Sequence, residues 1–129
     1  MERPVRVLLV DDEAAIRTLL SQSLKQWGYD LIEAASAVDA LEINKASPKP
    51  IDVLVSDIVM PEMTGLELAR ELSHSNPQMK VLFMSGFYEC PANVKAEWEF
   101  LQKPFSPRAL CDRLERLCKR PSANSGNAA

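Results

Sequence analysis

The chain has 129 residues, of which 47% are hydrophobic and 26% charged, with a formal net charge of -3. This length suits one domain that buries roughly two-thirds of its unfolded surface, so neither disulfides nor a structural metal are needed for stability. The composition excludes a fibrous or wholly disordered protein, and the slight acidic excess offers no bulk electrostatic attraction for nucleic acid or anionic membrane.

The first part of the chain alternates short apolar segments with helical periodicity. Residues 5–10 form an apolar run that ends abruptly at an acid, which predicts a strand buried on both faces. Apolar residues then recur at helical spacing over residues 13–27, and Gly28 is placed to end that helix. A weaker strand is predicted over residues 29–34 and a helix over residues 37–45.

The second part repeats this alternation. Residues 51–56 form another apolar strand that ends at an acid, and residues 65–73 have the spacing of a helix. Further strands are predicted over residues 79–84 and 98–102. The last helix begins after Ser106, which can cap it, with a proline at its first position.

The predicted order is βαβαβαβαβα within one domain of residues 1–120, followed by a tail of residues 121–129 that we expect to be disordered. Right-handed crossovers fold such a chain into a doubly wound α/β domain, with five parallel strands and helices on both faces. The fourth helix has only residues 92–97 available, so we expect it to be shortened or irregular.

The three cysteines, at positions 90, 111 and 118, fit neither a disulfide framework nor a zinc site. No apolar run reaches the ~18 residues needed to span a bilayer, and an acidic Asp-Asp-Glu follows the first strand too early for a signal peptide. We therefore expect a cytoplasmic protein that contacts neither membrane nor nucleic acid directly.

Polar side chains follow four of the predicted strands, and ligands of open α/β sheets bind at the carboxyl ends of strands. These residues are Asp11 and Asp12 after the first strand, Asp57 after the third, Ser85 after the fourth and Lys103 after the fifth. Clustered carboxylates repel one another unless a cation lies among them, and Mg²⁺ takes oxygen ligands of this kind. Lys103 can hold an anion, and the Ser85 hydroxyl can donate to one of its oxygens.

A carboxylate beside Mg²⁺ and a fixed ammonium is a plausible nucleophile toward phosphorus. Asp57 is the better candidate because it stands alone, although spacing does not decide which of the three acids attacks. Taken singly, an Asp at a strand end is most often a turn or cap residue, and Lys-Pro or Ser-Gly is usually a loop. Their joint occurrence at carboxyl ends favours one shared site.

Four segments resemble the receiver domain of two-component response regulators. In family order they are VLLVDDE (7–13), VSDIVMPEMTG (55–65), FMSG (83–86) and FLQKPFS (100–106). The last two look most like receivers of hybrid sensor kinases. The resemblance implies a flavodoxin-like sheet with strand order 2-1-3-4-5. It also implies that Asp57 is the phosphoacceptor in a phosphorelay, charged by a histidine kinase or histidine phosphotransfer domain.

The resemblance further implies a role for each residue of the site. Asp12 and Asp57 would bind Mg²⁺ together with the backbone carbonyl of Val59, while Asp11 would act largely through a water on the metal. Lys103 would pair with the carboxylate and later with the phosphate.

Two further residues would respond to the phosphate. Ser85 would hydrogen-bond a phosphate oxygen, and Phe100 would be the aromatic residue that rotates when Ser85 moves. Val59 and Phe87 occupy the positions that tune water access in this family, and because both are apolar we expect slow self-dephosphorylation.

These residues indicate a signalling module rather than an enzyme acting on other substrates, with output through a partner or an effector outside these residues. An aspartate-nucleophile phosphohydrolase is one alternative, but it needs a second acid two residues after the nucleophile, where Val59 stands. A degenerate receiver used as a scaffold is the other, and the intact acids, Ser85 and Lys103 oppose it.

Overall fold

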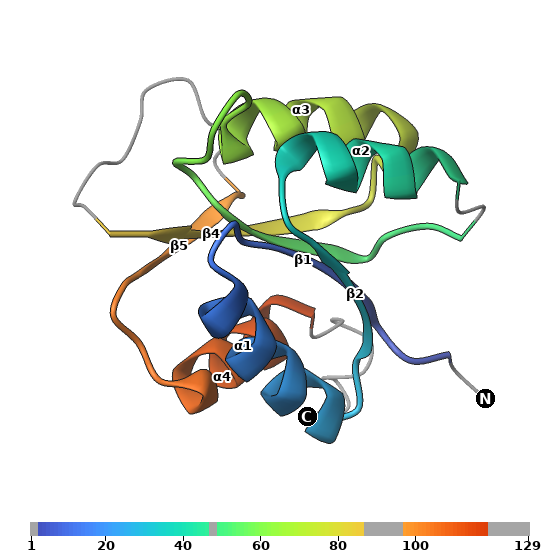
Figure 1. Cartoon of the computed structure of the whole chain (residues 1–129). Helices are drawn as coiled ribbons and strands as arrows, with labels where there is room; N and C mark the ends of the chain where they lie inside the picture. Colours follow the sequence, from blue (N-terminus) through green and yellow to red (C-terminus); the bar gives the residue numbers. More distant parts are fainter. Residues whose placement is uncertain (1–2, 47–48, 87–96, 119–129) are drawn as a thin grey trace.

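The computed structural model describes residues 3–46, 49–86 and 97–118 of the chain. Within them, five parallel strands form one sheet in the order β2-β1-β3-β4-β5. Helices α2 and α3 cover one face of the sheet, and α1 and α4 cover the other (Figure 1). The predicted fold class and strand order are therefore confirmed. The tail, nearly all of the predicted short helix, and Phe87 lie outside the described residues.

The observed elements agree with the predicted ones to within two residues at each described boundary. The strands are β1 (Arg6–Val10), β2 (Asp30–Ala34), β3 (Val53–Asp57), β4 (Lys80–Ser85) and β5 (Glu99–Gln102). The helices are α1 (Ala14–Gln26), α2 (Ala37–Ala46), α3 (Gly65–Ser75) and α4 (Pro107–Cys118).

The core consists of two apolar layers, one on each side of the sheet. Every residue of the central strands β1 and β3 is buried, as expected for parallel strands covered on both faces. Phe83 and Leu68 belong to the layer under α2 and α3, whereas Leu24 and Leu110 belong to the layer under α1 and α4. Both layers leave the ends of the strands free for polar groups.

Local signals in the sequence explain where the helices begin and end. Gly28 follows α1 with a φ of +94°, a left-handed conformation that glycine adopts without strain. The backbone N–H of Ala109 donates to Ser106 Oγ at 3.1 Å, as predicted for the cap of α4. Helix α3 begins with a reciprocal capping box between Thr64 and Glu67, which the sequence analysis did not identify.

Candidate functional site

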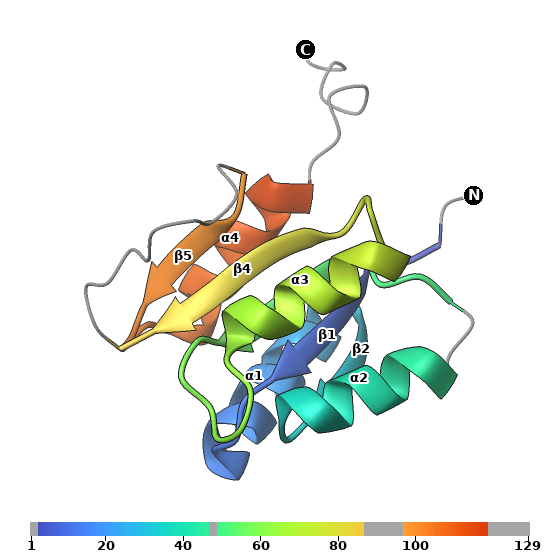
Figure 2. The same ribbon diagram turned by 90° about the horizontal axis from the view of Figure 1, so that it is seen from above.

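The carboxyl ends of β1, β3, β4 and β5 lie together at one end of the sheet, because the strands are parallel and in register. Figure 2 shows the arrowheads of β1, β4 and β5 directed toward that end. The polar residues of the predicted site follow from these elements: Asp11 and Asp12 come directly after β1, Asp57 ends β3, Ser85 ends β4 and Lys103 follows β5. The topology thus brings residues from four strands into one region.

The three acids form a compact cluster. Asp11, Asp12 and Asp57 each offer a carboxylate oxygen, and these atoms all lie within 4.8 Å of one another. Asp11 is completely buried and Asp57 is 8% exposed, whereas Asp12 is open to solvent. A cation can therefore approach the cluster from the Asp12 side.

Lys103 supplies the positive charge that the sequence predicts. Its Nζ lies 3.0 Å from Oδ1 of Asp57 and 3.6 Å from Oδ2 of Asp11. Burial lowers the pKa of Lys103, but its contacts with Asp57 and Asp11 outweigh this effect, and the net pKa is raised. The ammonium is therefore charged and bridges two of the three acids. Its backbone N–H donates to the carbonyl oxygen of Ser85 at 2.7 Å, which joins the ends of β4 and β5.

The electrostatics of Asp57 reflect a pocket with excess negative charge. Burial, the largest cause, raises the pKa of Asp57 to about 6, and the charge of Asp11 adds to this rise. The hydrogen bond from Lys103 acts in the opposite direction without cancelling it. Asp57 is therefore ionised at neutral pH, but its negative charge is destabilised by burial and by Asp11, and a bound cation would reduce this destabilisation.

The donor atoms fit a hard divalent cation. Oδ1 of Asp11 accepts a hydrogen bond from the backbone N–H of Glu13 at 2.8 Å, whereas the buried Oδ2 has only the 3.6 Å ion pair with Lys103 and no hydrogen bond among the described residues. An all-oxygen set of carboxylates in which one buried oxygen lacks a hydrogen bond suits Mg²⁺ better than softer metals. Asp11, Asp12 and Asp57 are the residues that would hold it. Val59 lies in the loop after β3 with its residue 73% exposed, and coordination by its carbonyl stays a prediction.

The backbone of Asp57 is held by contacts that the sequence analysis missed. The buried hydroxyl of Ser56 donates to the Asp57 carbonyl oxygen at 2.8 Å. The N–H of Gly65, the first residue of α3, donates to the carbonyl of Ile58 at 2.8 Å. A Cβ on Gly65 would overlap the Asp57 carbonyl oxygen, so only glycine lets α3 start this close to β3. The helix start at residue 65 was predicted, and the capping-box pattern Thr-x-x-Glu is a further sequence signal for it.

Phe100, the predicted switch residue, lies in an aromatic row across β4 and β5. Its ring centroid is 5.3 Å from that of Phe83, which in turn meets Trp98 edge-on at 5.5 Å. The Phe100 side chain is only partly buried, and its backbone carbonyl accepts a hydrogen bond from Arg113 at 2.8 Å. Rotation of this ring stays a prediction, as does the contact of Ser85 with a phosphate.

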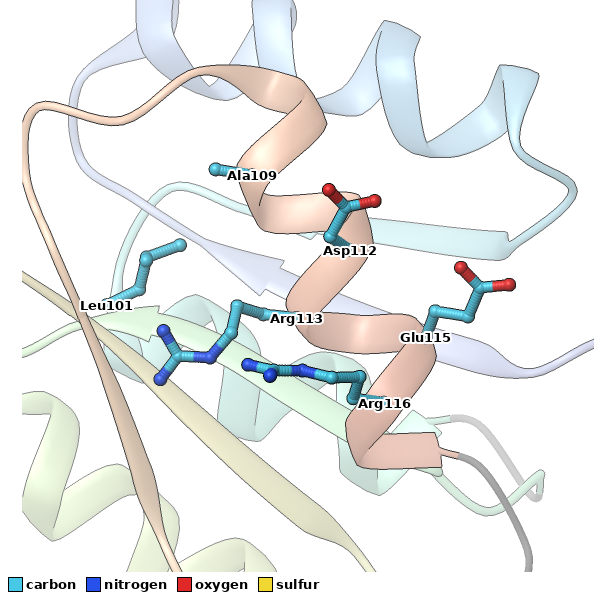
Figure 3. Close-up of a pocket in the computed structure, with 6 residues that line it drawn as sticks. All are labelled: Leu101, Ala109, Asp112, Arg113, Glu115 and Arg116. Carbon is cyan, nitrogen blue, oxygen red and sulfur yellow. The ribbon is translucent and has the colours of Figure 1, made fainter. Parts of the chain in front are cut away.

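A separate pocket of about 510 Å³ lies between α4 and β5. It is lined by Leu101, Ala109, Asp112, Arg113, Glu115 and Arg116. Figure 3 shows that Arg113 and Arg116 extend side by side from α4, while Asp112 and Glu115 point away from them. None of the lining residues belongs to the acidic cluster, and the mixed charges do not select a ligand.

Comparisons with known proteins agree with this geometry. The family model described as "Response regulator receiver domain" matches residues 7–115. The sensor kinase CckA of Brucella abortus is 42% identical over 120 residues, which are 88% of this chain and 12% of that protein. The response regulator receiver protein CpdR of the same organism is 33% identical over 116 residues, which are 87% of this chain and 95% of that protein.

Solved structures show the same similarity. The crystal structure of the receiver domain from the hybrid histidine kinase CckA has a TM-score of 0.78 and 31% identity over 88% of this chain and 99% of that one. The chemotaxis response regulator CheY4 of Vibrio cholerae has a TM-score of 0.77 and 29% identity over 88% and 98%. Among the described helices, none is both long and apolar enough to cross a membrane.

Proposed function

Because the chain belongs to the response regulator receiver family, whose model matches most of its length, we propose that it accepts a phosphoryl group on Asp57 and changes its surface as a result. The donor would be a phosphohistidine of a histidine kinase or of a phosphotransfer domain. The observation that carries this proposal is the placement of Asp57 between two further carboxylates and the Lys103 ammonium, 3.0 Å away.

The reaction follows from the charges of these residues. With a pKa of about 6, Asp57 is ionised at neutral pH, so a carboxylate oxygen can attack phosphorus in line with the leaving imidazole. The new bond is O–P, the P–N bond breaks, and the imidazole takes up a proton from solvent. Mg²⁺, when held by Asp11, Asp12 and Asp57, would neutralise charge on the phosphoryl oxygens. Lys103 moves from pairing with the carboxylate to pairing with the phosphate.

The phosphorylated state would differ from the free state at the ends of β4 and β5. A phosphoryl group adds roughly two negative charges and strong acceptor oxygens at Asp57. Ser85, at the end of β4, would donate to one of them, and Phe100 on the neighbouring strand would then repack. We propose that this local change is what a partner protein recognises.

Neither alternative has an observation in its favour. A phosphohydrolase would need an acid where Val59 presents an exposed apolar side chain. A scaffold without phosphotransfer would not need a lysine between Asp11 and Asp57. We propose that the chain acts in a cytoplasmic phosphorelay. Its similarity to the sensor kinase CckA and to the receiver protein CpdR is consistent with a role either as part of a longer kinase or as a separate receiver.

The test is incubation of the chain with Mg²⁺ and a small phosphodonor such as acetyl phosphate, followed by mass spectrometry. One phosphoryl group adds about 80 Da, and the expected shift is lost when Mg²⁺ is chelated. Asp57→Asn keeps the shape of the side chain and removes the nucleophile, so it should show no shift. A shift that persists in Asp57→Asn, or no shift in the unaltered chain, would overturn the proposal.

A further inference from the structure

Arg17, in the first turn of α1, contacts the backbone that carries two of the acids. Its Nη1 donates to the carbonyl oxygen of Asp11 at 2.7 Å. Its Nε lies 3.5 Å from Oε1 of Glu33 on β2, and its side chain is only 19% exposed. The guanidinium therefore joins the start of α1, the end of β1 and the end of β2.

Glu33 holds this guanidinium in a defined orientation. Its second carboxylate oxygen accepts a hydrogen bond from Ser21 Oγ at 2.7 Å, and Ser21, one turn after Arg17, is 3% exposed. Arg17 and Ser21, both on α1, thus each contact one carboxylate oxygen of Glu33. Since the planar guanidinium presents its donors in a rigid fork, fixing Nε also fixes the direction of Nη1.

The Asp11 carbonyl matters because it belongs to the peptide that joins Asp11 to Asp12. A peptide unit is planar, so holding its oxygen also holds the N–H of Asp12. On one side of this peptide, the N–H of Asp11 donates to the carbonyl of Ala34 at 3.3 Å. On the other side, the N–H of Glu13 donates to Oδ1 of Asp11 at 2.8 Å. Asp12 itself is exposed, so the backbone is what restrains it.

We propose that Arg17, oriented by Glu33 and Ser21, is a positioning residue that holds the Asp11–Asp12 peptide so that both carboxylates face the metal site. This inference rests on the function proposed above, because it takes Asp11, Asp12 and Asp57 as the residues that hold Mg²⁺. Arg17 acts through the backbone and does not touch the metal or the phosphoryl group.

The direction in which Mg²⁺ affinity changes in Arg17→Ala distinguishes a positioning role from a simple charge effect. Removing a cation near a divalent metal site favours metal binding on Coulombic grounds alone. Loss of positioning has the opposite effect, since residues that orient metal ligands typically contribute 10–100-fold to metal affinity. We therefore expect Arg17→Ala to weaken Mg²⁺ binding about tenfold. Arg17→Lys, which keeps the charge but not the fork, should recover only part of this loss.

The experiment measures Mg²⁺ affinity by calorimetry in the full chain, without phosphodonor, for Arg17→Ala, Arg17→Lys and Glu33→Gln. The matched control is Asp30→Asn, which removes the 3.2 Å ion pair between Arg6 and Asp30 at the opposite end of β1 and β2. Hydrogen exchange of the Glu13 amide, which donates to Oδ1 of Asp11, is the second measurement and is made in metal-free protein. It should accelerate in Arg17→Ala and Glu33→Gln and stay unchanged in the control.

Each outcome has a defined meaning. Unchanged or tighter Mg²⁺ binding in Arg17→Ala and Glu33→Gln would overturn the inference and leave the proposed function intact. If Arg17→Ala does not fold, Arg17→Lys decides by the same criteria. Glu33→Gln then decides through hydrogen exchange, because the loss of a nearby acid weakens Mg²⁺ binding on Coulombic grounds alone. A wild-type chain that binds no Mg²⁺ would overturn the proposed function and this inference together. A loss of stability without a change in affinity or in Glu13 exchange would show a purely structural role and reject the inference.

Discussion

Replacing Asp57 by asparagine should stabilise the metal-free protein at neutral pH while abolishing phosphorylation. The folded-state pKa of Asp57 is about 6, against 3.8 for an unperturbed carboxyl, and burial is the main cause. Because the folded-state pKa is the higher one, protonated Asp57 favours the folded state fully below about pH 4. This contribution is lost as the pH rises through about 6.

The magnitude follows from the size of this rise. Each pKa unit corresponds to about 1.4 kcal/mol, so a rise from 3.8 to about 6 amounts to about 3 kcal/mol above pH 7. Because the neighbouring Asp12 is exposed, solvent screening should reduce the effect to about 2 kcal/mol. The pKa of about 6 is a net value that already includes the attraction of Lys103, which lowers the pKa of Asp57. Asp57→Asn removes the ionised carboxylate and should therefore raise the free energy of unfolding by about 2 kcal/mol.

The assay is urea unfolding at about pH 7.5 and about pH 5 in the presence of a chelator, with the slope against urea checked for constancy. Asp112→Asn is the control, since that carboxylate is exposed on α4 and far less desolvated. The gain in Asp57→Asn should shrink at the lower pH, where Asp57 of the wild type is largely protonated. Equal or lower stability of Asp57→Asn at pH 7.5, or a gain that does not depend on pH, would refute this reasoning.

Three further predictions concern the loop after β3, the lysine and the rim of the site. Gly65→Ala should destabilise the fold by about 2 kcal/mol in urea unfolding, because the new Cβ meets the Asp57 carbonyl. Gly86→Ala is the control, and because its Cβ would enter open space it should change stability by less than about 0.5 kcal/mol. Lys103→Met should slow phosphorylation by acetyl phosphate about 100-fold, because the phosphoryl group loses the ammonium that pairs with it. Mg²⁺ binding measured by calorimetry should be retained, since the substitution removes a cation that competes for the carboxylates. Equal rates for Lys103→Met and wild type would contradict its pairing with the phosphate. Val59→Asn or Phe87→Glu should shorten the lifetime of the phosphorylated protein, followed by mass spectrometry, and an unchanged lifetime in both variants would reject the water-access hypothesis.

Sequence patterns predict the α/β fold class and the place of the site because both depend on short-range features, whereas the strand order was implied by the resemblance to receivers. An apolar run that ends at an acid defines the end of a parallel strand, and parallel strands bring such ends together. The positions of Asp11, Asp57 and Lys103 could be inferred in this way. The choice of Asp57 among the acids came from the resemblance to receivers and stays a prediction, and the 3.0 Å contact between Asp57 and Lys103 supports it.

The contacts that hold these residues could not be predicted by the same means. Arg17 and Glu33 lie in different elements, and they meet only because β1 and β2 pair with Leu9 opposite Glu33. The requirement for glycine at position 65 depends on how closely α3 approaches β3, a distance that no local pattern encodes. The positions at which side chains act through the backbone are therefore the part of the site that depends on tertiary structure.

Strand β5 is an edge of the sheet, and its pairing with β4 is the only strand pairing it makes in the described part of the chain. Backbone groups on such an edge can pair with strands of other molecules and start aggregation. Here the guanidinium of Arg113 covers the edge, since it donates to the Phe100 carbonyl at 2.8 Å and lies 3.5 Å from Glu99. The same side chain that lines the pocket on α4 thus occupies a backbone acceptor of β5 that a strand of another molecule would otherwise be able to use for β-pairing.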